Sequence, residues 1–297
     1  MRIQHQFGGN WTDEKLERVR KYLHAYTTIF NANPKAQKLH TIYVDAFAGT
    51  GYRHPPNTAS QATPLFDDSL VEEENQSFLK GSARIALEVE PPFKEYVFIE
   101  RDPDYARELI HLQEEFAGHR SNIRVISQDA NLYLLEWIRS TNWNKTRAVV
   151  FLDPYGMEVE WNVIQALGQT EAVDLWILFP LGVAVNRLLT KTGPPPEAWA
   201  RALTRIFGTN AWQDVFYPHK KVQTLFGEEE IQSKEADFEK IGEFFLSQLK
   251  TAFFEVAPKP LALLNSKNNP LYLLCFASAN RKGARTAIKI ARHILEK

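Results

Sequence analysis

A run of residues after the first apolar stretch has the composition of a ligand-binding turn. It reads YVDAFAGTG over residues 43–51, so an acid, Asp45, precedes two glycines spaced G-x-G. Glycine lets the backbone turn tightly and approach a ligand with no Cβ in between. An ordinary strand-to-helix turn is the alternative reading of this pattern. The run predicts a binding turn formed by Asp45, Phe47, Gly49 and Gly51.

A second acid, Glu100, ends the next apolar stretch. In nucleotide-binding α/β folds, an acid at this place accepts hydrogen bonds from ribose hydroxyls and follows the glycines by about 20 residues. Glu100 follows Gly51 by 49 positions, and 49 − 29 leaves 20 once the 29 residues of an inserted segment, 52–80, are set aside. The spacing predicts a ribose acceptor; the alternative is a solvated carboxylate that pairs with Arg101.

A third acid, Asp129, follows the next predicted strand and directly precedes Ala130. At the carboxyl edge of a parallel sheet its carboxylate can accept the amino proton of an adenine. Asp is also a common N-cap, here for a helix over 130–140. Both roles are compatible because a carboxylate has two oxygens. We expect Asp129 and Ala130 to contact the ligand.

The fourth strand ends in FLDPYG over residues 151–156. An acid, a proline and an aromatic residue there form a rigid edge with a stacking face. The Asp153 carboxylate and a backbone carbonyl can accept hydrogen bonds from a planar exocyclic amine, while Tyr155 stacks on its ring. The alternative is a turn in which Pro154 only ends the strand. The run predicts a catalytic edge of Asp153, Pro154 and Tyr155.

Alternating strands and helices position these residues. The first predicted helix covers residues 13–30 and is capped by Thr12. Predicted strands follow over 39–46, 95–100, 122–127, 147–153 and 172–179, with predicted helices over 104–117, 130–140 and 161–167. Buried strands separated by single helices predict an α/β fold with a Rossmann-like, doubly wound, mostly parallel sheet.

The chain divides into three predicted parts. Residues 1–192 form the core with its N-terminal helix and the inserted loop 52–80, and residues 193–260 form a helical elaboration. Within the latter we expect helices over 197–207 and 236–254 with a less regular stretch between them. Residues 261–297 close the core with an antiparallel hairpin, 261–265 and 271–278, and a last helix, 283–296.

The inserted loop 52–80 lacks periodicity and carries an acidic run, Glu72–Glu74. Its ends join the glycine turn and Ser82, which we expect to cap a helix over 83–88. The loop is therefore predicted to be a mobile segment beside the ligand entrance. A passive insertion is the alternative, because lengthening a loop costs little free energy.

Composition narrows the class of protein. The 297 residues are 44% hydrophobic and 24% charged with a formal net charge of −1, as in a folded protein without a global basic field. The single cysteine, Cys275, excludes an internal disulfide framework. The N-terminal MRIQH lacks an apolar signal core, and no apolar run reaches membrane-spanning length, so we expect a cytoplasmic protein without a membrane partner.

Several features are better explained without a binding function. The eight histidines show no metal-ligand spacing, so no metal site is expected. The basic face of the last helix (Arg285, Lys289 and Arg292) is predicted to be solvated, with phosphate binding as the alternative. Four aromatic residues are expected to form a small core rather than a stacking surface: Phe207, Trp212, Phe216 and Tyr217.

The motifs resemble those of class I S-adenosylmethionine-dependent methyltransferases. The resemblance is closer still to the bacterial three-Cys-motif partner (TcmP) family, and it extends from the opening helix to the hairpin that ends at Ser278. The residues that carry it are the four motifs above together with Trp161, DLW at 174–176, LFPLG at 178–182 and NRLL at 186–189.

The resemblance implies a cofactor, S-adenosylmethionine, held by the residues named above. DPYG lacks the second proline of the DPPY pattern of adenine and cytosine amino-methyltransferases, and it is closer to the DPFG of tRNA guanine-N2 dimethyltransferases. We therefore expect methyl transfer to an exocyclic amine of a nucleic-acid base, with RNA slightly favoured over DNA as the substrate. The alternatives are a non-catalytic cofactor-binding subunit that recognises nucleic acid or a three-Cys-motif partner protein, and a protein or small-molecule methyltransferase.

Overall fold

An eight-stranded sheet forms the centre of the computed structural model, which describes residues 11–49, 81–118, 120, 122–224 and 227–297. The strand order is β3-β2-β1-β4-β5-β10-β8, with β9 also paired to β10. Five strands are parallel: β1 (His40–Asp45), β2 (Glu95–Ile99), β3 (Ile123–Ile126), β4 (Thr146–Leu152) and β5 (Val173–Phe179). Each lies within one residue of its predicted bounds.

The far side of the sheet is antiparallel. There β10 (Pro270–Ser278) pairs with β5 on one side, and with β9 (Leu261–Leu264) and β8 (Glu255–Val256) on the other. The predicted α/β class, a doubly wound and mostly parallel sheet with a C-terminal antiparallel hairpin, is confirmed. The two-residue strand β8 had no counterpart in the sequence analysis.

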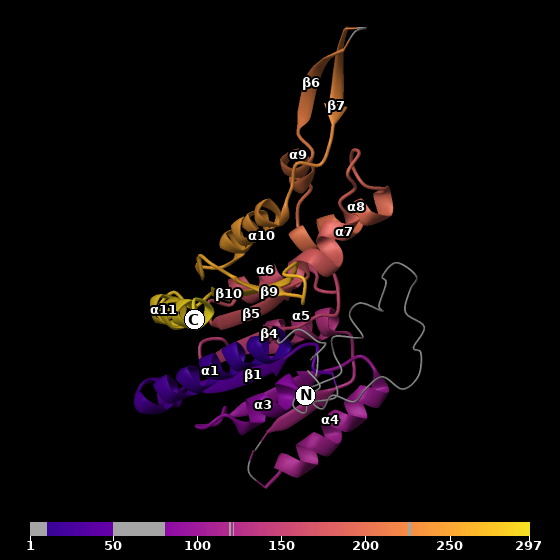
Figure 1. Ribbon diagram of the computed structural model, residues 1–297. Coiled ribbons are helices and arrows are strands. Elements are labelled where there is room, and N and C mark those ends of the chain that lie inside the picture. The colour runs from indigo at the N-terminus through magenta and orange to yellow at the C-terminus, as the bar shows by residue number, and fades with distance from the viewer. Residues whose placement is uncertain (1–10, 50–80, 119, 121, 225–226) are drawn as a thin grey trace, which may run out of the picture.

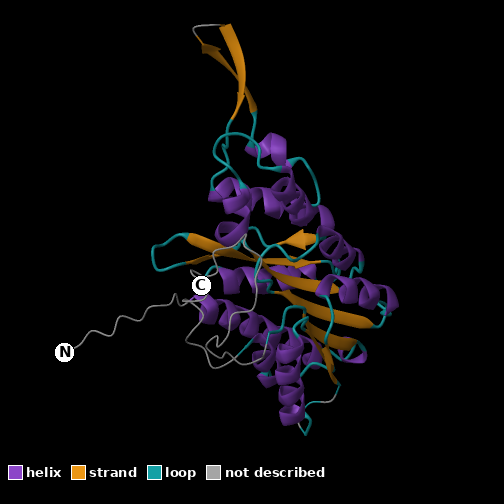
Figure 2. Cartoon of the chain, turned by 90° about the vertical axis from the view of Figure 1, so that its right-hand side faces the viewer, coloured by secondary structure: helices purple, strands orange, loops and turns teal. Residues whose placement is uncertain are grey.

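Helices cover both faces of the sheet (Figures 1 and 2). One face carries α1 (Trp11–Ala32), α3 (Ser82–Glu88), α4 (Pro103–Phe116) and α11 (Ala284–Leu295). The other face carries α5 (Ala130–Ser140), α6 (Trp161–Gln169) and α10 (Phe238–Ala252). A short 3-10 helix, η1 (Ala36–Lys38), precedes β1. None of the helices in these ranges is long and apolar enough to cross a membrane.

The inner face of α1 is apolar with three exceptions, Thr12, Lys15 and Thr27. Thr12 was expected to cap the helix, but α1 already includes Trp11, and Thr12 is fully buried with no hydrogen-bond partner for its hydroxyl among the described residues. Lys15, one turn later, is also buried, with 3% of its side chain exposed. A charged group on the inner face needs a partner, and the partner of Lys15 lies at the carboxyl edge described below.

The segment after β5 builds a separate layer. It contains η2 (Leu181–Val185), α7 (Asn186–Leu188), α8 (Glu197–Phe207) and α9 (Trp212–Phe216). A Cβ on Gly182 would lie 1.9 Å from the Pro270 carbonyl oxygen, so η2 packs directly on the start of β10. The small aromatic core is confirmed, because four rings are fully buried here: Phe207, Trp212, Phe216 and Tyr217.

The stretch expected to be less regular instead contains a hairpin. Strands β6 (His219–Thr224) and β7 (Gly227–Gln232) form an antiparallel two-stranded sheet. In both views this hairpin projects away from the rest of the molecule, beyond α9 (Figures 1 and 2). Neither strand alternates apolar and polar residues, so no period-two pattern predicts this hairpin.

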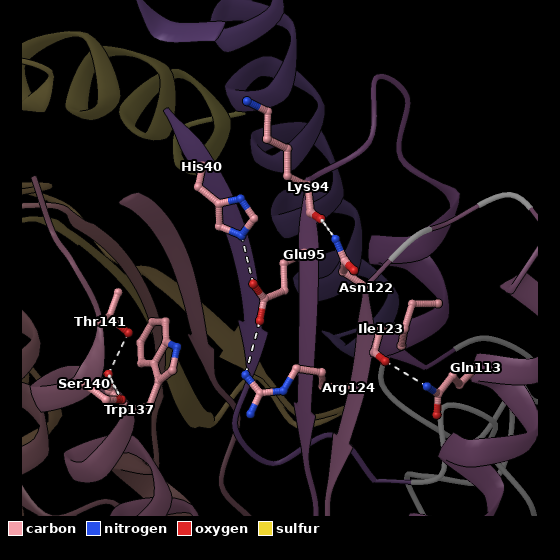
Figure 3. Close-up of polar contacts among 10 residues, drawn as sticks. All are labelled: His40, Lys94, Glu95, Gln113, Asn122, Ile123, Arg124, Trp137, Ser140 and Thr141. Atoms are coloured by element: carbon pink, nitrogen blue, oxygen red, sulfur yellow. Dashed lines mark hydrogen bonds and ion pairs between the residues drawn. The ribbon is translucent and has the colours of Figure 1, made fainter. Parts of the chain in front are cut away.

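Ion pairs tie the amino ends of the parallel strands together (Figure 3). Glu95, which begins β2, accepts from His40 Nε2 on β1 at 2.8 Å and from Arg124 Nη1 on β3 at 3.3 Å. Nearby, the Asn122 amide donates to the Lys94 carbonyl oxygen at 3.3 Å (Figure 3). Both oxygens of Glu95 are thus bound to basic side chains of the neighbouring strands. The role of Glu95 is therefore structural.

A buried carboxyl joins α1 to β5 and β10. Asp174 is 6% exposed and accepts from the Tyr22 hydroxyl at 2.7 Å and the Ser278 hydroxyl at 2.5 Å. Burial raises the pKa of Asp174 to about 6, and these hydrogen bonds oppose the rise. The folded protein therefore binds a proton here more tightly than the unfolded chain does.

This raised pKa predicts a pH-dependent stability. The contribution of Asp174 to the free energy of unfolding should fall by about 3 kcal/mol as the pH rises from about 4 to about 6. It should stay constant below and above this pH range. Denaturant titrations of the wild type and Asp174→Asn at pH 4, 5, 6 and 7 measure it. The difference between the two proteins should change with pH in this window; a constant difference would contradict the assignment.

Candidate active site

The predicted site residues gather where the strand order of the sheet reverses. The chain runs from β1 outward to β2 and β3, and from β4 outward to β5, so β1 and β4 flank the switch point at which doubly wound folds bind ligands. Asp45 is the last residue of β1, and Asp153 directly follows β4. The two acids therefore stand side by side at the carboxyl edge of the sheet.

Backbone hydrogen bonds fix the turn after β1 to both neighbouring strands. The Ala46 N–H donates to the Phe151 carbonyl of β4 at 3.1 Å, and the Ala48 N–H donates to the Ile99 carbonyl of β2 at 3.1 Å. Phe47, between them, is partly buried against the core. These two hydrogen bonds hold the turn in place across the switch point.

Gly49 ends the described part of this turn in a left-handed conformation, with φ of +60°. A Cβ there would meet no atom of the described residues within 4 Å, so none of these residues fills the space beside the glycine. Its N–H donates to Glu100 Oε2 at 3.0 Å, and the Asp102 N–H donates to Glu100 Oε1 at 2.8 Å. The structure thus brings Glu100 to the glycine turn. Gly51 lies outside the described residues, as does the predicted loop 52–80.

Both acids of this half of the site are destabilised as anions. Burial raises the pKa of Glu100, while its two backbone hydrogen bonds oppose the rise. Asp45 is fully buried, and burial raises its pKa to about 7; the charge of Asp153 adds to the rise, whereas Ser82 and Lys15 oppose it. The Tyr43 hydroxyl lies 3.4 Å from Asp45 Oδ2, and Asp45 Oδ1 is buried without a hydrogen-bond partner among the described residues.

Asp129 performs the capping role that the sequence allowed. It is the N-cap of α5, and its Oδ1 accepts from the Leu132 N–H at 3.1 Å. Ala130, the first residue of α5, is buried. The carboxylate lies at the end of β3, two strands from the switch point, and contact with a ligand stays a prediction.

The predicted catalytic edge follows β4. Asp153 is partly buried and pairs with Lys15 of α1, with 2.5 Å between Lys15 Nζ and Asp153 Oδ2. Pro154 is buried, while Tyr155 is 65% exposed. At this edge the Tyr155 ring is exposed to solvent, and the neighbouring Asp153 carboxylate is bound by Lys15.

Three contributors to the site were not foreseen. One feature of the sequence could have pointed to Lys15: it is a lysine within the apolar stripe of a predicted helix. Ser82 was expected to cap α3, but the N-cap is Gly81 without a side-chain hydrogen bond, and the Ser82 side chain instead opposes the rise in the pKa of Asp45. Asn131 donates to the Glu158 carbonyl at 2.9 Å and accepts from the Glu160 N–H at 3.0 Å, so it fixes the loop after Tyr155.

Other candidate sites are weaker. Among the described residues no group of three or more His, Cys, Asp or Glu side chains is placed to hold a metal ion. Two surface hollows lie elsewhere, one beside α8 around Arg201 and one between α5 and α6 around Trp143. Neither is lined by a predicted site residue. Raised pKa values at a sheet edge are a physical mark of a functional site, and they occur at Asp45 and Glu100.

Comparison with known proteins gives distant structural similarities. No protein-family model and no curated protein matches the chain. A DUF519 protein from Legionella pneumophila is 15% identical, with a TM-score of 0.41, and the match covers 82% of this chain and 93% of that one.

Two methyltransferase structures are also similar. An S-adenosylmethionine-dependent methyltransferase from Clostridium acetobutylicum is 9% identical, with a TM-score of 0.35 and coverage of 89% and 91%. Magnesium protoporphyrin IX methyltransferase from Synechocystis, solved with S-adenosylmethionine, is 9% identical, with a TM-score of 0.29 and coverage of 78% and 84%. The assignment of the site therefore depends on the residues of this chain.

Proposed function

We propose that this protein is a class I methyltransferase that uses S-adenosylmethionine to methylate an exocyclic amine of a nucleic-acid base. The observation that carries the proposal is the convergence of Asp45, Glu100 and Asp153 on the switch point, with Glu100 already bonded to the Gly49 N–H at 3.0 Å. The motif resemblance to the TcmP family supports the same cofactor.

The residues of the edge fit this cofactor. Asp45 Oδ1, which is buried without a hydrogen-bond partner among the described residues, would be an acceptor for a cationic ligand, and none of those residues fills the space beside Gly49. Glu100 uses one lone pair on each oxygen for backbone N–H groups, so each oxygen can still accept a ribose hydroxyl. Asp129 and Ala130 would contact the adenine. When bound, the cofactor supplies an electrophilic methyl group.

The acceptor side needs orientation more than acid–base chemistry. Asp153, with the Pro154 carbonyl, would accept the N–H groups of the amine, which directs the nitrogen lone pair away from the edge and towards the methyl carbon. Formation of the N–C bond would be balanced by cleavage of the methyl–sulfur bond, with S-adenosylhomocysteine as the leaving group, and the amine proton would pass to Asp153 or solvent. Holding the nucleophile in line in this way supplies most of the catalysis.

A cationic cluster beside the edge supports a polyanionic substrate. We define it as Arg187, Lys191 and Lys234. The Lys234 backbone N–H donates to the Lys191 carbonyl at 3.3 Å, and burial together with the Lys191 charge lowers the pKa of Lys234. The Lys234 ammonium contacts Asn186 Oδ1 at 2.5 Å. Within the described ranges no carboxylate forms an ion pair with any of the three.

The segments that carry the cluster follow β5, which neighbours β4, so they begin at the carboxyl edge that carries Asp153. Arg205 of α8 also donates to the Met157 carbonyl, just beyond Tyr155, at 3.3 Å. Unpaired cations attract phosphates, which supports a nucleic acid over a small apolar substrate. The DPYG sequence favours RNA over DNA.

Tyr155 is expected to stack on the base. Two variants should distinguish the contribution of its ring from that of its hydroxyl. Tyr155→Phe should retain activity, whereas Tyr155→Ala should raise the KM for nucleic acid by about 5- to 100-fold, since a base–aromatic stack contributes about 1–3 kcal/mol. Steady-state kinetics at saturating cofactor measure both. Equal kinetics for the alanine variant and the wild type would exclude stacking by Tyr155.

The function is tested by methyl transfer from labelled S-adenosylmethionine to total RNA, DNA and protein, each in separate reactions at low and high salt. The proposal predicts label in RNA, with incorporation that falls as salt rises. Label in protein or in small molecules alone would overturn the nucleic-acid assignment. Cofactor binding without transfer to any pool would favour a non-catalytic subunit, for which a three-Cys-motif protein is the candidate partner.

A further inference from the structure

A buried lysine is not expected in α1 if this helix only covers the sheet. Lys15 retains only 3% of its side-chain exposure, and its ammonium lies 2.5 Å from Asp153 Oδ2 and 5.4 Å from the centre of the Trp11 ring. Moving an ammonium out of water costs several kcal/mol, and an apolar residue of similar volume commonly stabilises such a position at least as well. Helix packing alone therefore gives no reason for Lys15.

The ion pair has a direct consequence for Asp153. A charge-assisted hydrogen bond to Oδ2 fixes the carboxylate in one orientation. The other oxygen, Oδ1, is not among the buried polar atoms that lack a partner, and 17% of the side chain is exposed. Lys15 thus holds Asp153 from the protein side and leaves Oδ1 accessible from the substrate side.

Lys15 also balances the charges of the switch point. Burial raises the pKa of both Asp45 and Tyr43, and the charge of Asp153 adds to both rises, so the two carboxylates lie close together. Among the described residues, the ionisable groups shown to face Asp153 are Lys15 from α1, and Asp45 and Tyr43 from β1. Lys15 is the cation of this group, and its charge also opposes the rise in the pKa of Asp45.

We propose that Lys15 is a positioning residue for methyl transfer: it fixes the orientation of Asp153 so that Oδ1 accepts the substrate amine. This inference depends on the function proposed above. It makes α1, which precedes the nucleotide-binding core, a functional part of the acceptor site rather than a cover for the sheet.

The test compares Lys15→Met, Lys15→Arg and a control, Arg18→Met. Arg18 is a second, mostly buried cation of the same helix, but it contacts Glu14 and the Ile294 carbonyl, away from the edge. Lys15→Met should lower kcat by about tenfold or more and leave the KM for the cofactor unchanged, because the loss is confined to the orientation of the acceptor. Lys15→Arg should restore part of kcat, and Arg18→Met should change only stability.

A second measurement needs no substrate, so failure of this inference is distinguishable from failure of the proposed function. Carboxyl-carbon NMR at one pH compares the Asp153 signal of the wild type with that of Lys15→Met. The Asp153 signal should be displaced in the variant, because the carboxylate loses its fixed partner; if Lys15→Met does not fold, Lys15→Gln should show the same displacement. An unchanged Asp153 signal, or an unchanged kcat while the melting temperature falls, would show that Lys15 is only structural.

Discussion

The Asp153→Ala variant is expected to transfer methyl groups about 100- to 10,000-fold more slowly than the wild type, while it still binds the cofactor. The loss should fall on kcat, because the substitution removes the acceptor that orients the amine and leaves the glycine turn and Glu100 in place. Single-turnover kinetics with saturating cofactor measure the rate, and calorimetry measures binding.

The ion pair with Lys15 dictates the control for this experiment. Removing Asp153 alone leaves a buried ammonium without this partner, at a cost of about 3–5 kcal/mol in stability. The double variant Lys15→Met/Asp153→Ala removes both charges and should regain much of that stability without regaining activity. Full activity in either variant would refute the assignment of Asp153 to the catalytic edge.

The Glu100→Ala variant is expected to weaken S-adenosylmethionine binding by about 100-fold or more. Two ribose hydrogen bonds to a carboxylate are lost, each of about 1.5–3 kcal/mol, together with the bond that holds the Gly49 N–H. At saturating cofactor kcat should stay near the wild-type value, because the acceptor edge is intact.

The matched control for Glu100 is the acid at the opposite end of the same strand. Glu95→Ala removes a carboxylate that pairs with His40 and Arg124 at the amino edge (Figure 3). It should lower stability and leave cofactor affinity unchanged. A similar loss of affinity in both variants would mean that the effect of Glu100 is structural.

The sequence predicted the parallel half of the sheet accurately, for a physical reason. Strands β1, β2, β4 and β5 are buried on both faces, so each forms a nearly continuous apolar run with a sharp polar end. The same polar ends carry Asp45, Glu100 and Asp153. Fold and candidate site were therefore readable from one signal, the acid that follows a buried run.

The elements that were missed lack such a signal. Strand β8 has only two residues and forms because it pairs with the edge of β10. No local sequence pattern indicates this pairing. The contact between Lys15 and Asp153 joins residues 138 positions apart. A lysine in an apolar helical stripe indicates a buried partner, but only the folded sheet identifies that partner as the edge acid.

Calorimetric titration of the folded protein with S-adenosylmethionine, and separately with S-adenosylhomocysteine, tests the central claim most directly. The claim is that the turn at Gly49 and the acids Asp45 and Glu100 form a preformed cofactor site. We predict heat of binding at one ligand per chain for the wild type, and a strong loss of affinity for Glu100→Ala but not for Glu95→Ala. No heat with either ligand at high concentration, from protein whose folding is verified by circular dichroism, would contradict it.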